Sequence, residues 1–227
     1  MPLLAKSILI FHVLTGLIVL FTGIAVLVLP KGNNRHRQLG WIYFWAMMGI
    51  SISGVGLLLV ARFNAFLMLI AVLTFYVSYT GMRSFRRVAS QVNKLDYGAA
   101  WTAMLTGLLG IVYGGYNFIR LPELSPGAIL ILLFGSFVFT IAWNDLNAFK
   151  TPEIMTSKWR VQYHITRMGG SFIAAITAFT LVGVRRLTEG WEYDWIMWLI
   201  PTILISPIIS YYKRFSKWGK GKAKTSK

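Results

Sequence analysis

Five ionisable residues lie in or beside long apolar segments. Four of them belong near one end of these segments, where their side chains could bind a polar ligand or ligate a haem iron. They are His36, Asp145, His164 and Arg167. An ionisable group inside a membrane-spanning helix is costly, so each is expected to have a structural or functional reason. His164 and Arg167 are three residues apart and therefore share one face of a helix.

Asp145 and Arg167 are expected to form an ion pair. Asp145 falls in the last turns of one expected helix, where the macrodipole disfavours an anion, and Arg167 in the first turns of the next, where it disfavours a cation. A short loop joins the two helices, so they must be antiparallel neighbours and pairing relieves both problems. Two interpretations stay open: a structural ion pair that locks two helices, or a polar pocket that opens to the cytoplasm.

A site that combines the four residues is geometrically possible at the cytoplasmic end of the molecule. His36 is expected just before a helix, on one face with Gly40 and Tyr43. His12 belongs near the outer end, as a packing residue or a second candidate ligand. No metal site and no catalytic residue is predicted. The candidate ligand-binding residues are His36, Arg37, Tyr43, Asn144, Asp145, His164 and Arg167.

The elements that must position these residues are apolar helices. Hydrophobic residues make up 56% of the 227 residues and charged residues only 13%. A helix needs about 20 apolar residues to cross a bilayer, and the chain has several apolar segments of about this length. The sequence predicts an all-α polytopic membrane protein, with a seven-helix transmembrane domain over 1–212 and a basic cytoplasmic tail over 213–227. Glycine and alanine stripes favour the fourth and sixth helices as central. The expected spans are 7–29, 40–60, 65–82, 98–119, 127–148, 161–184 and 195–212.

The positive charges predict the orientation. Seventeen Lys and Arg residues lie on the side of the C-terminal tail and five on the other. Positive residues favour the cytoplasm, so the N-terminus is expected outside and the tail inside. Membrane topology explains the net charge of +16, so nucleic acid is not an expected partner, whereas anionic lipid is expected at the tail. The short loops fit a multi-pass protein of a bacterial inner (plasma) membrane.

Several chemistries are excluded or weakened. The chain has no cysteine, which excludes disulfides, thiolate metal sites and covalently attached c-type haem. The segment 195–212 has no lysine for a retinal Schiff base. Histidine pairs with zinc-hydrolase spacing, Walker motifs and nucleophile elbows are absent. Asp145 is the only carboxylate inside an expected span, so a carboxylate proton relay is not expected.

The first two expected helices carry a recognisable pattern. His12 is followed by Gly16 and Gly23, and the sequence H-R-x-x-G-x-x-Y runs from His36 to Tyr43. This pattern resembles an uncharacterised family of predicted bacterial membrane proteins, and the segment around His164 and Arg167 is similar to bacterial relatives as well. The resemblance implies a polytopic membrane fold and brings no established activity.

Three functions are compatible with these features. The first is a protein that binds or moves a small polar or anionic ligand through a cytoplasm-facing polar pocket. The second is a redox protein with b-type haem or a linked quinone, in which His36 and His164 are axial ligands and nearby arginines meet the propionates. The third is a structural or assembly subunit with a partner protein in a membrane complex.

Overall fold

The protein is a bundle of long helices, seen in a computed structural model that describes residues 2–85, 92–120, 126–180 and 196–215. Within these ranges there are seven α-helices, one short 3-10 helix and no β-strand. The helices are α1 (Leu3–Val28), α2 (Asn34–Val60), α3 (Ala65–Arg83), α4 (Lys94–Arg120), α5 (Pro126–Lys150), η1 (Pro152–Ile154), α6 (Ser157–Phe179) and α7 (Ile196–Phe215).

Side-chain caps set where several helices begin. Asn33 accepts a hydrogen bond from the backbone N–H of His36, which satisfies one of the unpaired donors at the start of α2. The helix therefore begins at Asn34, six residues before the apolar segment from residue 40. The expectation that His36 precedes this helix is wrong: His36 lies in its first turn. Thr156 caps α6 in the same way, by accepting from the N–H of Trp159.

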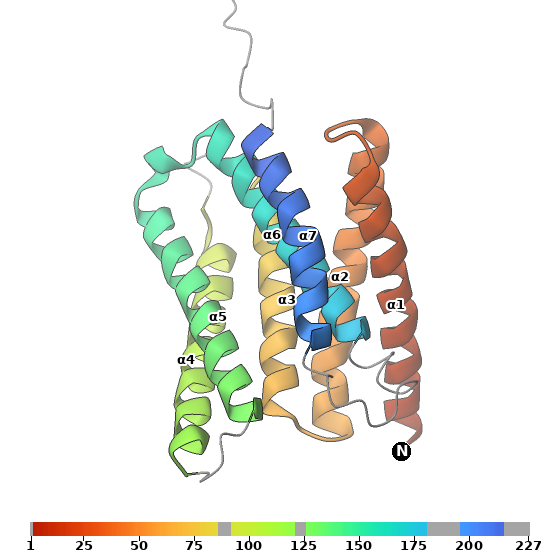
Figure 1. The fold of residues 1–227 in the computed structure, drawn as a ribbon, viewed down its shortest axis with the longest axis vertical. Coiled ribbons are helices and arrows are strands. Elements are labelled where there is room, and N and C mark those ends of the chain that lie inside the picture. The colour runs from red at the N-terminus through yellow and green to blue at the C-terminus, as the bar shows by residue number, and fades with distance from the viewer. Residues whose placement is uncertain (1, 86–91, 121–125, 181–195, 216–227) are drawn as a thin grey trace, which may run out of the picture.

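Successive helices run in alternating directions along the long axis of the bundle (Figure 1). The Lys31 ammonium, just after α1, lies 4.2 Å from the ring centroid of Tyr212 near the end of α7. His164 near the start of α6 contacts the carbonyl of Gly81 near the end of α3. The ends of α1, α3, α5 and α7 and the starts of α2, α4 and α6 therefore lie together, and we call this the polar end. The N-terminus lies at the opposite end (Figure 1).

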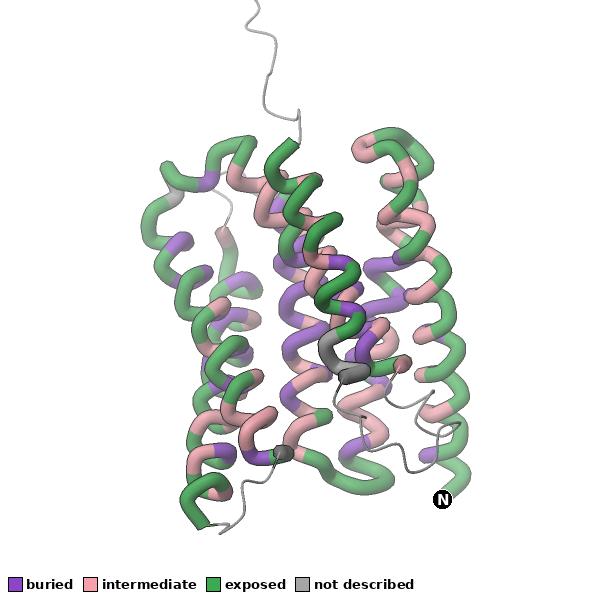
Figure 2. The backbone as a smooth tube through the Cα atoms, viewed as in Figure 1, coloured by how far each residue is buried: buried purple, intermediate pink, exposed green. Residues whose placement is uncertain are grey.

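The outer surface of the bundle is largely apolar. Five helices, α1 to α5, are long and apolar enough to cross a membrane, as judged by length and composition among the described residues. Large apolar side chains such as Phe21, Leu109 and Ile119 are exposed, whereas buried residues gather on the inner sides of the helices (Figure 2). These are the features of a membrane-spanning protein, whose lipid-facing surface need not be polar.

The centre of the bundle is α3, which packs against α2, α4, α5 and α6. The prediction that the fourth helix is central is wrong, because α4 packs mainly on α5 and less extensively on α3. The glycines of α4 serve the contact with α5. A Cβ added to Gly107 or Gly114 would lie within 2.7 Å of α5 backbone nitrogen, and one added to Gly135 of α5 would meet α4 backbone at 2.8 Å. Small residues thus allow close backbone approach at one edge of the bundle.

Some sequence predictions fall outside the described residues. The expected sixth span runs to residue 184 and its following loop holds Arg185 and Arg186, but the description of this segment stops at Thr180. The tail is described only to Phe215, where α7 ends three residues beyond the expected domain boundary at residue 212.

Candidate functional site

The predicted pair of Asp145 and Arg167 forms inside the polar end of the bundle. Arg167 Nη2 donates to both carboxylate oxygens of Asp145, at 2.7 Å and 2.8 Å. Both residues are buried, with 2% of Asp145 and 8% of Arg167 exposed. The predicted pairing is confirmed, and it joins the last turns of α5 to the middle of α6.

Two tyrosines complete the surroundings of this carboxylate. Tyr76 of α3 and Tyr163 of α6 donate their hydroxyls to Asp145 Oδ2, at 2.5 Å and 2.7 Å. The Arg167 guanidinium carbon also lies 4.6 Å from the Tyr163 ring centroid and 5.5 Å from that of Tyr76. A buried charge is tolerated when it is both paired and hydrogen-bonded. These four residues, which we call the aspartate cluster, connect α3, α5 and α6.

The guanidinium of Arg167 is only partly used in this cluster. Its Nη2 makes the ion pair and lies 3.4 Å from the carbonyl oxygen of Ile141. Its Nη1 is buried and has no hydrogen-bond partner among the described residues. Leaving a buried donor without an acceptor costs about 1–3 kcal/mol, more for a charged group. Nη1 is therefore the position of the cluster where an additional acceptor atom would be stabilised.

A second polar group lies between α2, α3 and α6. His164 Nδ1 is 2.9 Å from the carbonyl oxygen of Gly81. A carbonyl oxygen only accepts, so Nδ1 carries the proton and Nε2 of the neutral ring keeps its lone pair. His36, in the first turn of α2, lies at the same end of the bundle without a hydrogen bond to His164, and its buried Nδ1 has no hydrogen-bond partner among the described residues. We call these two residues the histidine pair.

The structure thus separates the four predicted residues into two groups. His164 contacts α3 on the side of α2, where Phe85 packs against its ring at a centroid distance of 4.4 Å. The longer side chain of Arg167 passes Gly81 and reaches α5 instead. Residues three apart on a helix share a face but differ in direction by about 60°, which is enough here to point them at different neighbours.

Three further candidates take other places. Tyr43 of α2 is buried and shares a 2.8 Å hydrogen bond with Ser171 of α6, which joins these two helices. Arg37 and Asn144 are exposed, and within the described ranges neither side chain is hydrogen-bonded to the aspartate cluster or the histidine pair. The structure does not bring these two residues into either group.

His12 is a contact between α1 and α2. Its Nδ1 lies 2.9 Å from Ser53 Oγ, which donates its own hydrogen to a carbonyl of α2, so His12 donates to Ser53. His12 precedes the end of α1 by sixteen residues, about 24 Å along the helix axis. It therefore lies far from the polar end, in agreement with its predicted separation from the other histidines.

A second ion pair was not predicted from the sequence. Asp96 of α4 is fully buried and receives hydrogen bonds from Arg83 Nε and Nη2, at 3.1 Å and 2.9 Å. It also accepts from the backbone N–H of Asn93, whose side chain accepts from the N–H of Asp96. Asp145 is therefore not the only carboxylate within a helix. The signal was the capping pattern of Asn93 and Asp96, three residues apart.

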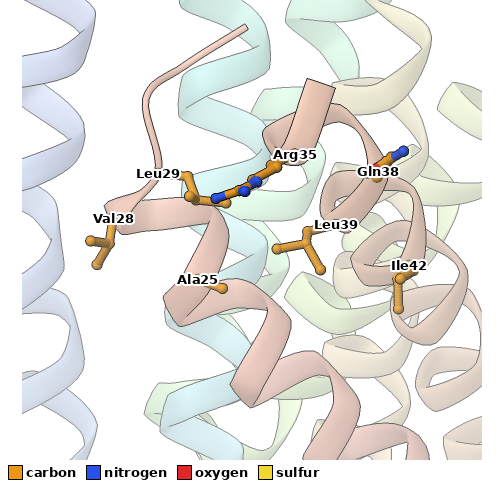
Figure 3. Close-up of a pocket in the computed structure, with 7 residues that line it drawn as sticks. All are labelled: Ala25, Val28, Leu29, Arg35, Gln38, Leu39 and Ile42. Carbon is orange, nitrogen blue, oxygen red and sulfur yellow. The ribbon is translucent and has the colours of Figure 1, made fainter. Parts of the chain in front are cut away.

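A cavity of about 630 Å³ opens between the end of α1 and the start of α2. Neither the aspartate cluster nor the histidine pair lines it. Figure 3 shows its lining residues, with Arg35 extending from the first turn of α2 toward α1. We call it the α1–α2 groove, lined by Ala25, Val28, Leu29, Arg35, Gln38, Leu39 and Ile42.

Within the described ranges, no three side chains of His, Asp or Glu gather in a way that could hold a metal ion. The resemblance of the first two helices to an uncharacterised bacterial family stays a prediction. Protein-family descriptions, curated proteins and solved structures were each compared with the chain, and none of them matches it.

Proposed function

We propose that this is a seven-span protein of a bacterial inner membrane that binds or moves a small polar ligand at the aspartate cluster. In this proposal the N-terminus lies outside, and the polar end faces the cytoplasm. The 17-to-5 distribution of Lys and Arg residues supports the orientation. The seven helices alternate in direction, so the start of α1 and the end of α7 lie at opposite ends of the bundle, which supports an odd number of spans.

The observation that carries the binding proposal is the free Nη1 of Arg167. The guanidinium lies between two tyrosine rings, is held by Asp145, and has donors left over at a buried position. Intramembrane arginines that face the interior of a bundle mark substrate pathways in many membrane proteins. Because Asp145 already neutralises Arg167, a ligand with a neutral carbonyl or a single carboxylate suits the position better than a multiply charged anion.

Ligand binding to the purified protein tests this proposal. We would record thermal unfolding in detergent with acetate, phosphate, acetamide and a water-soluble short-chain quinone. At least one compound should raise the midpoint for the wild-type protein, and the rise should disappear in Arg167→Lys, which keeps the charge but loses the forked donors. Arg83→Lys is the matched control, because it makes the same change at the other ion pair, and it should keep the rise.

Asp145→Asn separates binding from folding. If the cluster binds a ligand, this variant should stay folded and lose the ligand response. A variant that cannot be purified in folded form, together with a wild-type protein that responds to no compound, would contradict the proposal. The aspartate cluster would then be a structural lock, as expected for a structural or assembly subunit.

The histidine pair favours a second candidate function, a haem- or quinone-linked redox protein. The hydrogen bond from His164 Nδ1 to Gly81 leaves Nε2 as a lone-pair donor, and metal-ligating histidines are commonly fixed by such a carbonyl contact. A visible spectrum of the purified protein tests this candidate. A Soret band lost in His164→Ala and kept in His12→Ala would support haem. A colourless wild-type protein would exclude bound haem.

A further inference from the structure

The α1–α2 groove has one polar end and an apolar body. Most of its lining consists of alkyl side chains, among them Leu29, Leu39 and Ile42, and its polar lining residues are Arg35 and Gln38. Arg35 is in the first turn of α2, and Ile42 lies seven residues further along, about 10 Å deeper into the bundle. The groove therefore changes from cationic to apolar along the helix axis.

Among the described residues, no carboxylate pairs with the cation at the polar end of the groove. The first turn of α2 contains no acidic residue, and the first carboxylate in the sequence is Asp96. Arg35 is exposed and forms no ion pair with any described residue. The start of a helix already carries a partial positive charge, which disfavours a cation such as Arg35 and favours an anion beside it.

The neighbouring cation is engaged elsewhere. The Lys31 ammonium donates to the carbonyls of Val26 and Leu27 in the last turn of α1 and to that of Leu29, which follows the helix, at 2.6–3.0 Å. Partial burial lowers the pKa of Lys31. Lys31 thus holds the backbone turn at the rim of the groove, while Arg35 extends across from α2 (Figure 3). The guanidinium of Arg35 is the group at this rim that an anionic headgroup would meet.

We propose that the α1–α2 groove binds an anionic phospholipid from the leaflet at the polar end. The lipid phosphate pairs with Arg35, and the upper part of one acyl chain lies against Leu29, Leu39 and Ile42. The volume of about 630 Å³ lies within the usual range of ligand sites and suits part of a lipid. A soluble anion would leave the apolar body unfilled. This inference rests on the chain spanning the membrane, and is independent of any ligand at the aspartate cluster.

Reconstitution in nanodiscs of defined composition tests the site. We would compare phosphatidylcholine alone with phosphatidylcholine containing phosphatidylglycerol, and measure the thermal unfolding midpoint and the phosphatidylglycerol retained per protein after extraction. The wild-type protein should be stabilised by phosphatidylglycerol and retain it. Arg35→Gln should lose both effects and unfold at the wild-type midpoint in phosphatidylcholine alone.

Arg37→Gln is the matched control. Arg37 is exposed two residues away, carries the same charge and does not line the groove. This variant should keep the response to phosphatidylglycerol. An equal loss in both variants would overturn the proposal in favour of general attraction between basic residues and anionic lipid. Arg167→Lys should also keep the response, so failure of the lipid site and failure of the proposed function can be distinguished.

The apolar part of the site has its own test. Ala25→Phe fills the groove from α1 and leaves Arg35 in place, so it should reduce retained phosphatidylglycerol as strongly as Arg35→Gln does. Glycerol 3-phosphate, which has the headgroup chemistry without acyl chains, should not raise the unfolding midpoint in detergent. A rise that Arg35→Gln abolishes would identify the occupant as a soluble anion and overturn the lipid assignment.

Discussion

The two buried ion pairs of this protein use the same chemistry in different surroundings. Asp96 lies in the first turn of α4, accepts a backbone N–H and pairs with Arg83, whose side chain is 24% exposed. Asp145 lies between three helices and pairs with Arg167, whose side chain is 10% exposed. Tyrosines rather than backbone groups supply the remaining hydrogen bonds to Asp145.

Asp96 belongs to a helix cap, whereas Asp145 belongs to a buried polar cluster. A carboxylate near a helix start is stabilised by the macrodipole and the local backbone, so Asp96 needs little else. Asp145 is near a helix end, where the dipole opposes it, and depends on side chains from α3 and α6. The first pair joins the consecutive helices α3 and α4, with Asp96 buried and Arg83 partly exposed. The second joins α5 to α6, receives a further hydrogen bond from Tyr76 of α3, and leaves the Arg167 Nη1 donor buried without a hydrogen-bond partner among the described residues.

Removal of the two arginines should give the largest contrast. Arg167→Met leaves Asp145 as an uncompensated buried charge and should cost about 3–5 kcal/mol of stability. Arg83→Met should cost less, about 1–3 kcal/mol, because Arg83 is partly exposed and Asn93 still donates to the buried Asp96. Unfolding by sodium dodecyl sulfate in mixed micelles measures both.

A double variant checks the cause of this difference. Asp145→Asn combined with Arg167→Met removes both charges, so it should be more stable than Arg167→Met alone. If the double variant is as unstable as the single one, the loss comes from packing rather than from an unpaired charge. Equal costs for the two arginine variants would remove the distinction between cap and cluster.

The positions of Asp145 and Arg167 could be paired from sequence because the argument is local. A short loop places the end of α5 and the start of α6 at one end of the bundle, and the macrodipole disfavours Asp145 near the end of α5. The expectation that these two helices pack as neighbours is wrong, because each packs against α3 and they scarcely contact each other. Arg167 lies in the middle of α6, and its long side chain reaches Asp145. The alternation of helix directions likewise brings the starts of α2 and α6 to one end, so the sequence could predict that His36 and His164 lie at the same end of the bundle. Helix order and the central apolar segments follow from composition in the same way.

The tyrosines could not be found in this way. Tyr76 meets Asp145 only because α3 packs between α2, α5 and α6, and lateral packing is not encoded in the length or hydropathy of a segment. Asp96 was missed for a different reason. A span chosen for its apolar residues begins at residue 98 and so leaves out the polar first turn of α4, which begins at Lys94. The spacing of Asn93 and Asp96 marks this start. The capping pattern was the better guide to that boundary.

The tyrosine hydroxyls give the next contrast. Tyr76→Phe removes a buried hydrogen bond to a carboxylate and should cost about 1.5–3 kcal/mol. Tyr79→Phe should cost less than Tyr76→Phe, because the Tyr79 hydroxyl lies 3.4 Å from Asp96 Oδ1, against 2.5 Å between the Tyr76 hydroxyl and Asp145, and because Arg83 and Asn93 still donate to Asp96. Unfolding by sodium dodecyl sulfate in mixed micelles measures the stability of both variants. A larger cost for Tyr79→Phe would show that the pair at the start of α4 depends on its aromatic neighbour after all.

Alanine substitutions at two glycines beside the ion pairs should change stability in opposite directions. A Cβ at Gly81 would lie 2.9 Å from both Arg167 Cβ and Met168 Sδ, so Gly81→Ala must push α3 and α6 apart and should cost about 1–3 kcal/mol. A Cβ at Gly98, two residues after Asp96, meets nothing within 4 Å. Gly98→Ala should therefore stabilise the exposed interior of α4 by about 0.5–1 kcal/mol, since alanine loses less entropy in a helix than glycine.

The sign of the two changes matters more than their size. If α3 and α6 separate readily, Gly81→Ala will be neutral, and the aspartate cluster is then held by its hydrogen bonds rather than by close helix contact. A destabilising Gly98→Ala would mean that another molecule covers this face of α4, which the described residues leave open. The expected pair of signs follows if the close helix contact lies at the buried aspartate cluster and Gly98 lies on an exposed face of α4.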